Sequence, residues 1–145
     1  MLYFPNAIKI NNDNTEEPIS VCEGCCSAED AISQFSIWED YYGWKLKRRW
    51  VEVYEGDKCI DNIPIKSLVE IIAEWKAETG IEPYQETVAI HRVGDTLYII
   101  TQKPGMFIGL CGIMYNKYKE IIQANGYKIN HINFIDIFFG NVREF

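Results

Sequence analysis

Apolar residues recur every three or four positions in three segments of the chain, and this spacing predicts three amphipathic helices. The first helix begins at Ser27 and stops at Gly43, the second lies between Ser67 and Gly80, and the third spans 113–125. Both serines precede an acidic residue by three positions, which is the pattern of an N-terminal helix cap. The apolar positions are Ala28, Ala31, Ile32, Phe35, Trp38 and Tyr42, then Leu68, Val69, Ile71, Ile72 and Trp75, then Met114, Tyr115, Tyr118, Ile121 and Ile122.

Between these helices, short runs of apolar and β-branched residues predict strands. We expect short strands around 7–10 and 19–21, and a strand or hairpin over 44–54. A hairpin over 87–93 and 96–102 turns at Gly94 and Asp95, and a long last strand spans 128–139. The last strand carries an apolar stripe, which we expect to form a sheet core: Ile129, Ile132, Phe134, Ile135, Ile137, Phe138 and Phe139.

A glycine loop follows the strand at 96–102. Pro104 and Gly105 end the strand, a short helical turn follows, and Gly109 and Gly112 then enclose two residues just before the third helix. The first amide groups of a helix have no partner within the helix, so a loop of this kind can hold a nucleic-acid phosphate.

The order helix, strand, strand, turn, helix, strand around this loop resembles the type II KH domain family, such as the KH domain of the bacterial small-subunit ribosomal KH protein. The resemblance covers residues 65 to 139, and its most specific part is 104–112. It implies a three-stranded sheet with helices on one face and binding of single-stranded RNA or DNA. Family members that bind nucleic acid usually have a basic or polar residue between the glycines, whereas this chain has Leu110 and Cys111. The residues it places at the nucleic acid are Lys103, Ile108, Gly109, Leu110, Cys111, Gly112, Lys117 and Lys119.

Charge separates the two halves of the chain. The formal net charge of −7 lies within residues 11–61, which hold 12 acidic and 5 basic side chains. Such a segment repels phosphate backbones, because non-specific affinity for nucleic acid grows with the number of phosphates that Lys and Arg neutralise. The alternative is therefore an acidic protein-binding adaptor or inhibitor, for example a phage-encoded, anti-CRISPR-like nucleic-acid mimic that blocks a basic nucleic-acid-binding protein.

Three of the five cysteines lie close together in the sequence, at 22, 25 and 26, and could bind a metal or react as thiols. Cys22 and Cys25 are separated by two residues, one of them Gly24, a spacing that lets two thiolates bind one Zn²⁺. The remaining ligands would come from Cys59 and from Cys26, an acidic side chain or a histidine. The set that the sequence predicts is Cys22, Cys25, Cys26 and Cys59. Idle thiols are the alternative, and a redox pair at the start of the first helix is a third. The odd number of five cysteines suits a reducing, cytoplasmic compartment.

A basic and aromatic run, 44–50, offers rings on which bases can stack, or simply a solvated face. On a regular strand Trp44, Leu46, Arg48 and Trp50 share one face, and Lys45, Lys47, Arg49 and Val51 share the other.

We expect an α+β protein with a small acidic α+β module at 1–62, stabilised by zinc if the cysteines bind it, and a type II KH-like domain at 63–145. No nucleophile, acid and base can be assembled from the spacing of the residues, so no enzyme is predicted. No membrane segment and no small-molecule substrate are expected.

Overall fold

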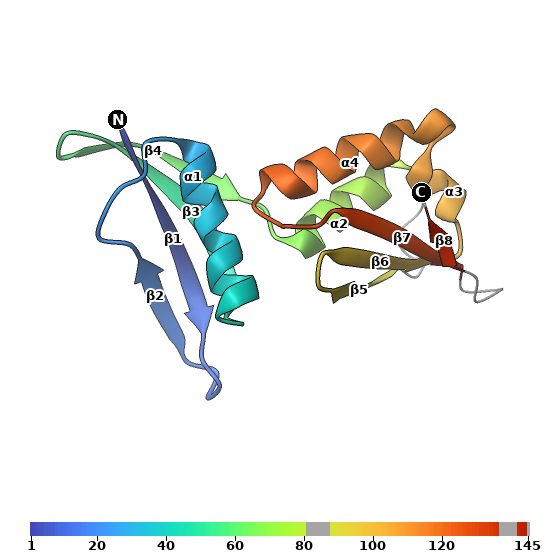
Figure 1. The fold of residues 1–145 in the computed structure, drawn as a ribbon, viewed down its shortest axis with the longest axis horizontal. Helices are drawn as coiled ribbons and strands as arrows, with labels where there is room; N and C mark the ends of the chain where they lie inside the picture. The colour runs from blue at the N-terminus through green and yellow to red at the C-terminus, as the bar shows by residue number, and fades with distance from the viewer. Residues whose placement is uncertain (81–87, 137–141, 145) are drawn as a thin grey trace. The chain divides into compact units, whose positions relative to one another are not determined.

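A computed structural model of the protein describes residues 1–80, 88–136 and 142–144. The fold is mixed α+β, as the sequence predicts, with two four-stranded sheets. The chain forms two compact units (Figure 1). Unit 1 comprises residues 1–67 together with 124–127, and unit 2 comprises 68–123 and 128–145. Within the described part of the chain, no helix is both long and apolar enough to cross a membrane.

Unit 1 is an antiparallel sheet with one helix on it. Its strands β1 (Leu2–Ile10), β2 (Glu16–Ser20), β3 (Lys45–Glu55) and β4 (Lys58–Ile65) pair in the order β2-β1-β3-β4. Helix α1 (Ala28–Ser36) continues into a π-helical turn, η1 (Ile37–Tyr41).

The predicted cap of α1 is confirmed, because the Ser27 hydroxyl accepts the Asp30 N–H at 3.1 Å. The apolar face of the helix packs on Ala7 and Val51, which belong to the two central strands. Ala31, Phe35 and Trp38 supply that face, and all three are buried.

A β-bulge changes which side chains of β3 share a face. Ile8 pairs with Arg48, but the next residue of β1, Lys9, pairs with Leu46, so Lys47 is an extra residue on β3. A bulge of this kind breaks the alternation of faces. Leu46 and Trp44 therefore pack with the core around α1. The prediction that they share a face with Arg48 and Trp50 is wrong for this reason.

Arg49 is buried rather than part of a solvated basic face, since only 4% of its surface is exposed. Its guanidinium forms an ion pair with Glu39 at 3.3 Å and donates to the carbonyls of Asn125, at 3.1 Å, and Lys66. The same group lies 4.4 Å from the centroid of the Tyr127 ring. These contacts hold residues 124–127 in unit 1.

Unit 2 contains α2 (Leu68–Glu78), β5 (Ala89–Val93), β6 (Thr96–Thr101), α3 (Pro104–Ile108), α4 (Ile113–Ala124), β7 (His131–Asp136) and β8 (Val142–Glu144). The sheet order is β5-β6-β7-β8, and β6 runs parallel to β7 while the other pairs are antiparallel. Rings from all three helices contact Phe134 of β7, so the helices cover one face of the sheet (Figure 1). The sheet has a fourth strand, β8, beyond the three expected.

The elements differ from the sequence-based expectation mainly at their ends. The last strand begins at His131 rather than 128, and its predicted continuation over 137–139 lies outside the described residues, as does residue 87 of the predicted hairpin. Residues 62–64, where the sequence suggested a boundary, pair with β3 as part of β4. These residues are therefore within unit 1, which extends to Ser67.

Candidate nucleic-acid interface

The glycine loop is held at the end of β6 by a series of local hydrogen bonds. The hydroxyl of Thr101, the last residue of β6, accepts the N–H of Lys103 at 3.0 Å. Pro104 then begins α3, where its lack of an N–H costs nothing. The N–H of Gly109 donates to the carbonyl of Gly105 at 3.0 Å and ends the helix.

Three residues of the loop adopt left-handed backbone conformations. Gly109 has φ = 77°, Cys111 has φ = 55° and Gly112 has φ = 75°. At Gly109 the reason is also steric, because an added Cβ would lie 2.7 Å from the Cγ atom and 3.1 Å from the backbone nitrogen of Met114. The chain therefore turns tightly against the first turn of α4. We call residues 109–112 the glycine corner.

The side chains around the glycine corner are mainly apolar and exposed. Leu110 has 81% of its surface exposed, Ile113 62% and Met106 40%. Cys111 is also exposed, and Ile108 is half-buried. None of the four residues of the glycine corner is basic, and the N–H groups of Gly109 and Gly112 already donate to the carbonyls of Gly105 and Gly109. Backbone contact with a phosphate would therefore come from the N–H groups of Leu110 and Cys111.

The three lysines implied by the KH resemblance have different surroundings. Lys103 is exposed just before α3. Lys117 forms an ion pair with Glu78 at the end of α2. The Lys119 ammonium lies 5.7 Å from the centroid of the Tyr115 ring. Lys117 is therefore engaged within unit 2.

Glu78 is held by two side chains of α4, the Lys117 ammonium and the Tyr118 hydroxyl. These hydrogen bonds, first from Lys117 and then from Tyr118, lower the pKa of the Glu78 carboxyl. Burial and the Glu78 carboxylate raise the pKa of Tyr118. The three groups join the end of α2 to the helix that follows the glycine corner.

Trp75 anchors the segment that leads into the glycine corner. Its indole N–H donates to the carbonyl of Phe107 at 2.9 Å, and its fully buried ring stacks on Tyr118 at 5.0 Å. The sequence pattern identified Trp75 only as an apolar position of α2. Its hydrogen bond to α3 had no sequence signal, because the partner is a main-chain carbonyl 32 residues away.

The cysteines lie in unit 1 apart from Cys111. Cys22, Cys26 and Cys59 are exposed and Cys25 is half-buried. The N–H groups and carbonyls of Cys25 and Tyr3 bond to each other, at 2.8 and 2.9 Å. In the described ranges of the chain, no three His, Cys, Asp or Glu side chains lie close enough together to hold a metal ion. Zinc stays a prediction of the sequence, which elemental analysis of the purified protein would test.

A redox pair at Cys25 is not favoured by its surroundings. Burial, then Asp30 and Cys26, raise the pKa of the Cys25 thiol. The sequence-based hypothesis required a pKa lowered by the start of α1, because the thiolate is the reactive form. The neighbouring charges act in the opposite direction.

Comparison of the chain with protein-family models, with curated proteins and with solved structures finds no significant match. The functional proposal therefore depends on the geometry of this chain's own residues.

Proposed function

We propose that unit 2 binds single-stranded RNA or DNA at the glycine corner, as a KH-like domain does. The observation that carries the proposal is the left-handed turn through Gly109, Cys111 and Gly112, which leads directly into α4. Its setting supports the same interpretation, because the elements α2, β5, β6, α3, α4 and β7 follow in the order on which the resemblance rests.

The apolar side chains at this site suit bases better than phosphates. Ile108, Leu110 and Ile113 give an apolar surface beside the backbone amides of the glycine corner. Unstacked bases of a single strand have apolar faces, which a duplex hides. We expect weak binding with a small dependence on salt, since few cations are available to replace the counterions of the strand.

The acidic residues of unit 1 do not favour nucleic-acid mimicry. They lie on β2 and the loop before it, just before and on the first turn of α1, on η1, and on β3, β4 and their turn, and some are paired, as Glu16 is with Lys47 and Glu39 with Arg49. A mimic of a duplex needs one continuous acidic face. The acidic residues come from several elements, and the ion pairs with Lys47 and Arg49 reduce the charge that such a face could present.

A second candidate, a protein-binding adaptor, is favoured by one observation. Leu110, Ile113 and Met106 are apolar side chains exposed close together in sequence around the glycine corner. Exposed apolar groups of this kind are a frequent feature of protein interfaces. The two candidates predict opposite effects of adding charge at Leu110.

The test is to replace Leu110 and Cys111 by lysine and to measure binding of fluorescein-labelled U12 RNA and dT12 DNA at low salt. Two ammonium groups beside the backbone amides should raise affinity at least about tenfold, equal to about 1.4 kcal/mol. Val93→Lys is the matched control, because Val93 is 56% exposed and lies at the other end of the β5–β6 hairpin.

Binding that neither form shows, or that Val93→Lys improves equally, would contradict the nucleic-acid proposal. A pull-down with and without nuclease, performed with the wild-type protein and with Leu110→Lys, tests the adaptor candidate. A direct protein partner should survive nuclease and be lost on Leu110→Lys, since a charge would then have to be buried in its apolar contact.

A further inference from the structure

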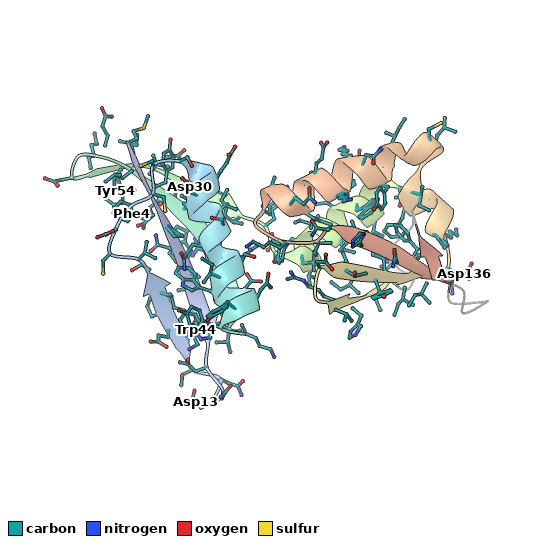
Figure 2. All side chains as sticks on the ribbon, viewed as in Figure 1. Phe4, Asp13, Asp30, Trp44, Tyr54 and Asp136 are labelled. Carbon is teal, nitrogen blue, oxygen red and sulfur yellow. The ribbon has the colours of Figure 1, made fainter. Side chains whose placement is uncertain are left out.

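A hollow of about 550 Å³ lies at one end of unit 1. It is enclosed by the loop between β1 and β2 on one side and by residues 42–45, which link η1 to β3, on the other. Its volume is within the range of about 300–1,000 Å³ that is usual for small-ligand sites. Figure 2 shows Trp44 at the end of unit 1 where the helix stops, and Asp13 at the tip of the loop.

One wall of this pocket is aromatic. Tyr42 and Trp44 stack with centroids 5.1 Å apart, and Trp38 stacks on Trp44 at 6.4 Å, all within 25° of parallel. The N–H of Trp44 donates to the Trp38 carbonyl at 3.0 Å, which fixes Trp44 against the end of η1. Tyr42 is 56% exposed, and its ring also contacts the ring of Tyr41 at right angles, with centroids 5.2 Å apart.

The other wall is cationic. The Lys9 ammonium lies 4.3 Å from the centroid of the Trp44 ring, and Lys45 is exposed at the start of β3, opposite Ile10. No residue that lines the pocket in the described part of unit 1 is acidic, although residues 11–61 hold 12 acidic side chains. The pocket is thus a locally positive place in an acidic module.

The Asp13 carboxylate, which belongs to the β1–β2 loop, is hydrogen-bonded within the loop. The Asp13 carboxylate accepts the hydroxyl of Thr15 at 2.6 Å and its N–H at 3.1 Å, and Asp13 does not line the pocket. Glu17, which is opposite Lys9 on β2, is not part of the lining either.

Asparagines supply the polar groups of the loop side. Asn11, Asn12 and Asn14 line the pocket, and the loop is ordered by bonds from the Asn11 N–H to the Thr15 carbonyl, at 2.8 Å, and from the Asn14 N–H to the Asn11 carbonyl, at 2.9 Å. A side-chain amide both donates and accepts, which matches the edge of a nucleobase.

We propose that this pocket binds a nucleotide, with the base stacked on Tyr42 and the phosphate held by Lys9 and Lys45. The π-helical turn that delivers Tyr42 agrees with this assignment, because such turns occur frequently at functional sites. A free mononucleotide and a nucleotide within a single strand share this chemistry. The site lies wholly in unit 1 and does not depend on the glycine corner of unit 2.

The experiment is a calorimetric titration of the full chain with 5′-AMP, and separately with adenosine, inorganic phosphate and the oligonucleotide dA6. We expect AMP to bind with a Kd of about 1 mM or below, and adenosine and phosphate to bind more weakly. Tyr42→Ala should weaken AMP binding at least about fivefold, in line with the loss of one base–aromatic stack. Lys45→Ala should weaken it about as much, and added salt should reduce the difference.

Two matched controls separate the pocket from general effects. Tyr98→Ala removes a half-buried tyrosine of β6 in unit 2, and Lys58→Ala removes an exposed lysine elsewhere in unit 1; neither residue lines the pocket. Both should bind AMP within about twofold of the wild-type protein, because surface changes remote from a site have small effects. Near-UV circular dichroism checks that Tyr42→Ala remains folded.

The outcomes divide cleanly. Binding of AMP that falls in Tyr42→Ala but not in Tyr98→Ala supports the proposal and shows that a free nucleotide is the ligand. Binding of dA6 alone with the same sensitivity supports it and names a single strand. No binding of either up to about 10 mM, phosphate that binds as well as AMP, or controls that lose as much as the pocket variants would each overturn it.

Discussion

Arg49 is the residue whose environment differs most from what its sequence neighbours indicate. It stands in a run of basic residues on β3, yet its side chain is buried and bonded to the carbonyls of Lys66 and Asn125, 17 and 76 residues away. A strand pattern describes alternation along one strand and contains no information on such distant partners. The neighbouring Arg48, by contrast, lies over the ring of Trp50 at 5.0 Å.

We predict that Arg49→Ala lowers the free energy of unfolding by about 3 kcal/mol or more, because it removes a buried guanidinium together with its ion pair to Glu39 and its hydrogen bonds to two carbonyls. Arg48→Ala is the control and should cost at most about 1 kcal/mol, the value of an exposed cation–π contact. Urea unfolding followed by tryptophan fluorescence measures both. Equal losses would show that Arg49 has no special role.

Glu78 gives a prediction on pH. Its folded-state pKa is lowered from the ordinary 4.5 by hydrogen bonds from Lys117 and Tyr118, so its contribution to stability is complete above about pH 4.5 and is lost as the pH falls through the folded-state pKa. Glu78→Gln should therefore be less stable than the wild-type protein at pH 7, and the difference should shrink at pH 3. Thermal unfolding at the two pH values measures it, and a difference that grows on acidification would contradict the assignment.

At the scale of elements, local sequence signals predicted the positions of the helices better than the pairing of the strands. The helices α1, α2 and α4 are where apolar spacing, Ser27 and the following glycines placed them. The β-bulge at Lys47 was not predictable, because it depends on the register between β1 and β3, which are joined by a long connection. For the same reason the pocket beside Trp44 had no signal, since its walls come from two segments that the sequence keeps apart.

The glycine corner gives a prediction at this scale. Gly109→Ala and Gly94→Ala both place a side chain at positive φ, 77° and 60°, which costs about 1 kcal/mol each. Only at Gly109 does the new Cβ also press on Met114, so we expect a further loss of about 1–3 kcal/mol. The difference in thermal stability between the two variants measures the cost of this contact with Met114. Equal stabilities would show that Gly109 does not approach α4 closely.

At the scale of the whole molecule, the chain passes from unit 1 to unit 2 and returns. Composition and charge predicted two parts, but they placed one boundary at 62–63, and the return of residues 124–127 to unit 1 was not foreseen. Gly126 packs there so closely that an added Cβ would lie 2.9 Å from the Ile32 carbonyl oxygen. The last residue of α4 and the three residues after it hold too little pattern to show on which unit they pack.

We predict that Tyr127→Ala weakens unit 1 although the residue follows α4 in sequence. Loss of this buried ring beside Arg49 should cost about 2–4 kcal/mol, in the range of large-to-small core substitutions. Amide hydrogen exchange should show faster opening in β1 and β3 than in β6 and β7, whereas the exposed neighbour Lys128→Ala should change neither. Loss of protection in β6 and β7 alone would contradict the placement of Tyr127 in unit 1.

The returning segment also has a consequence during synthesis of the protein. Residues 68–127 must be made after Ser67 before the Asn125 carbonyl and the Tyr127 ring can reach Arg49. At translation rates of about 5–20 residues per second these 60 residues take roughly 3–12 s. Residues 1–67 are therefore synthesised several seconds before Arg49 can form its contacts with Asn125 and Tyr127.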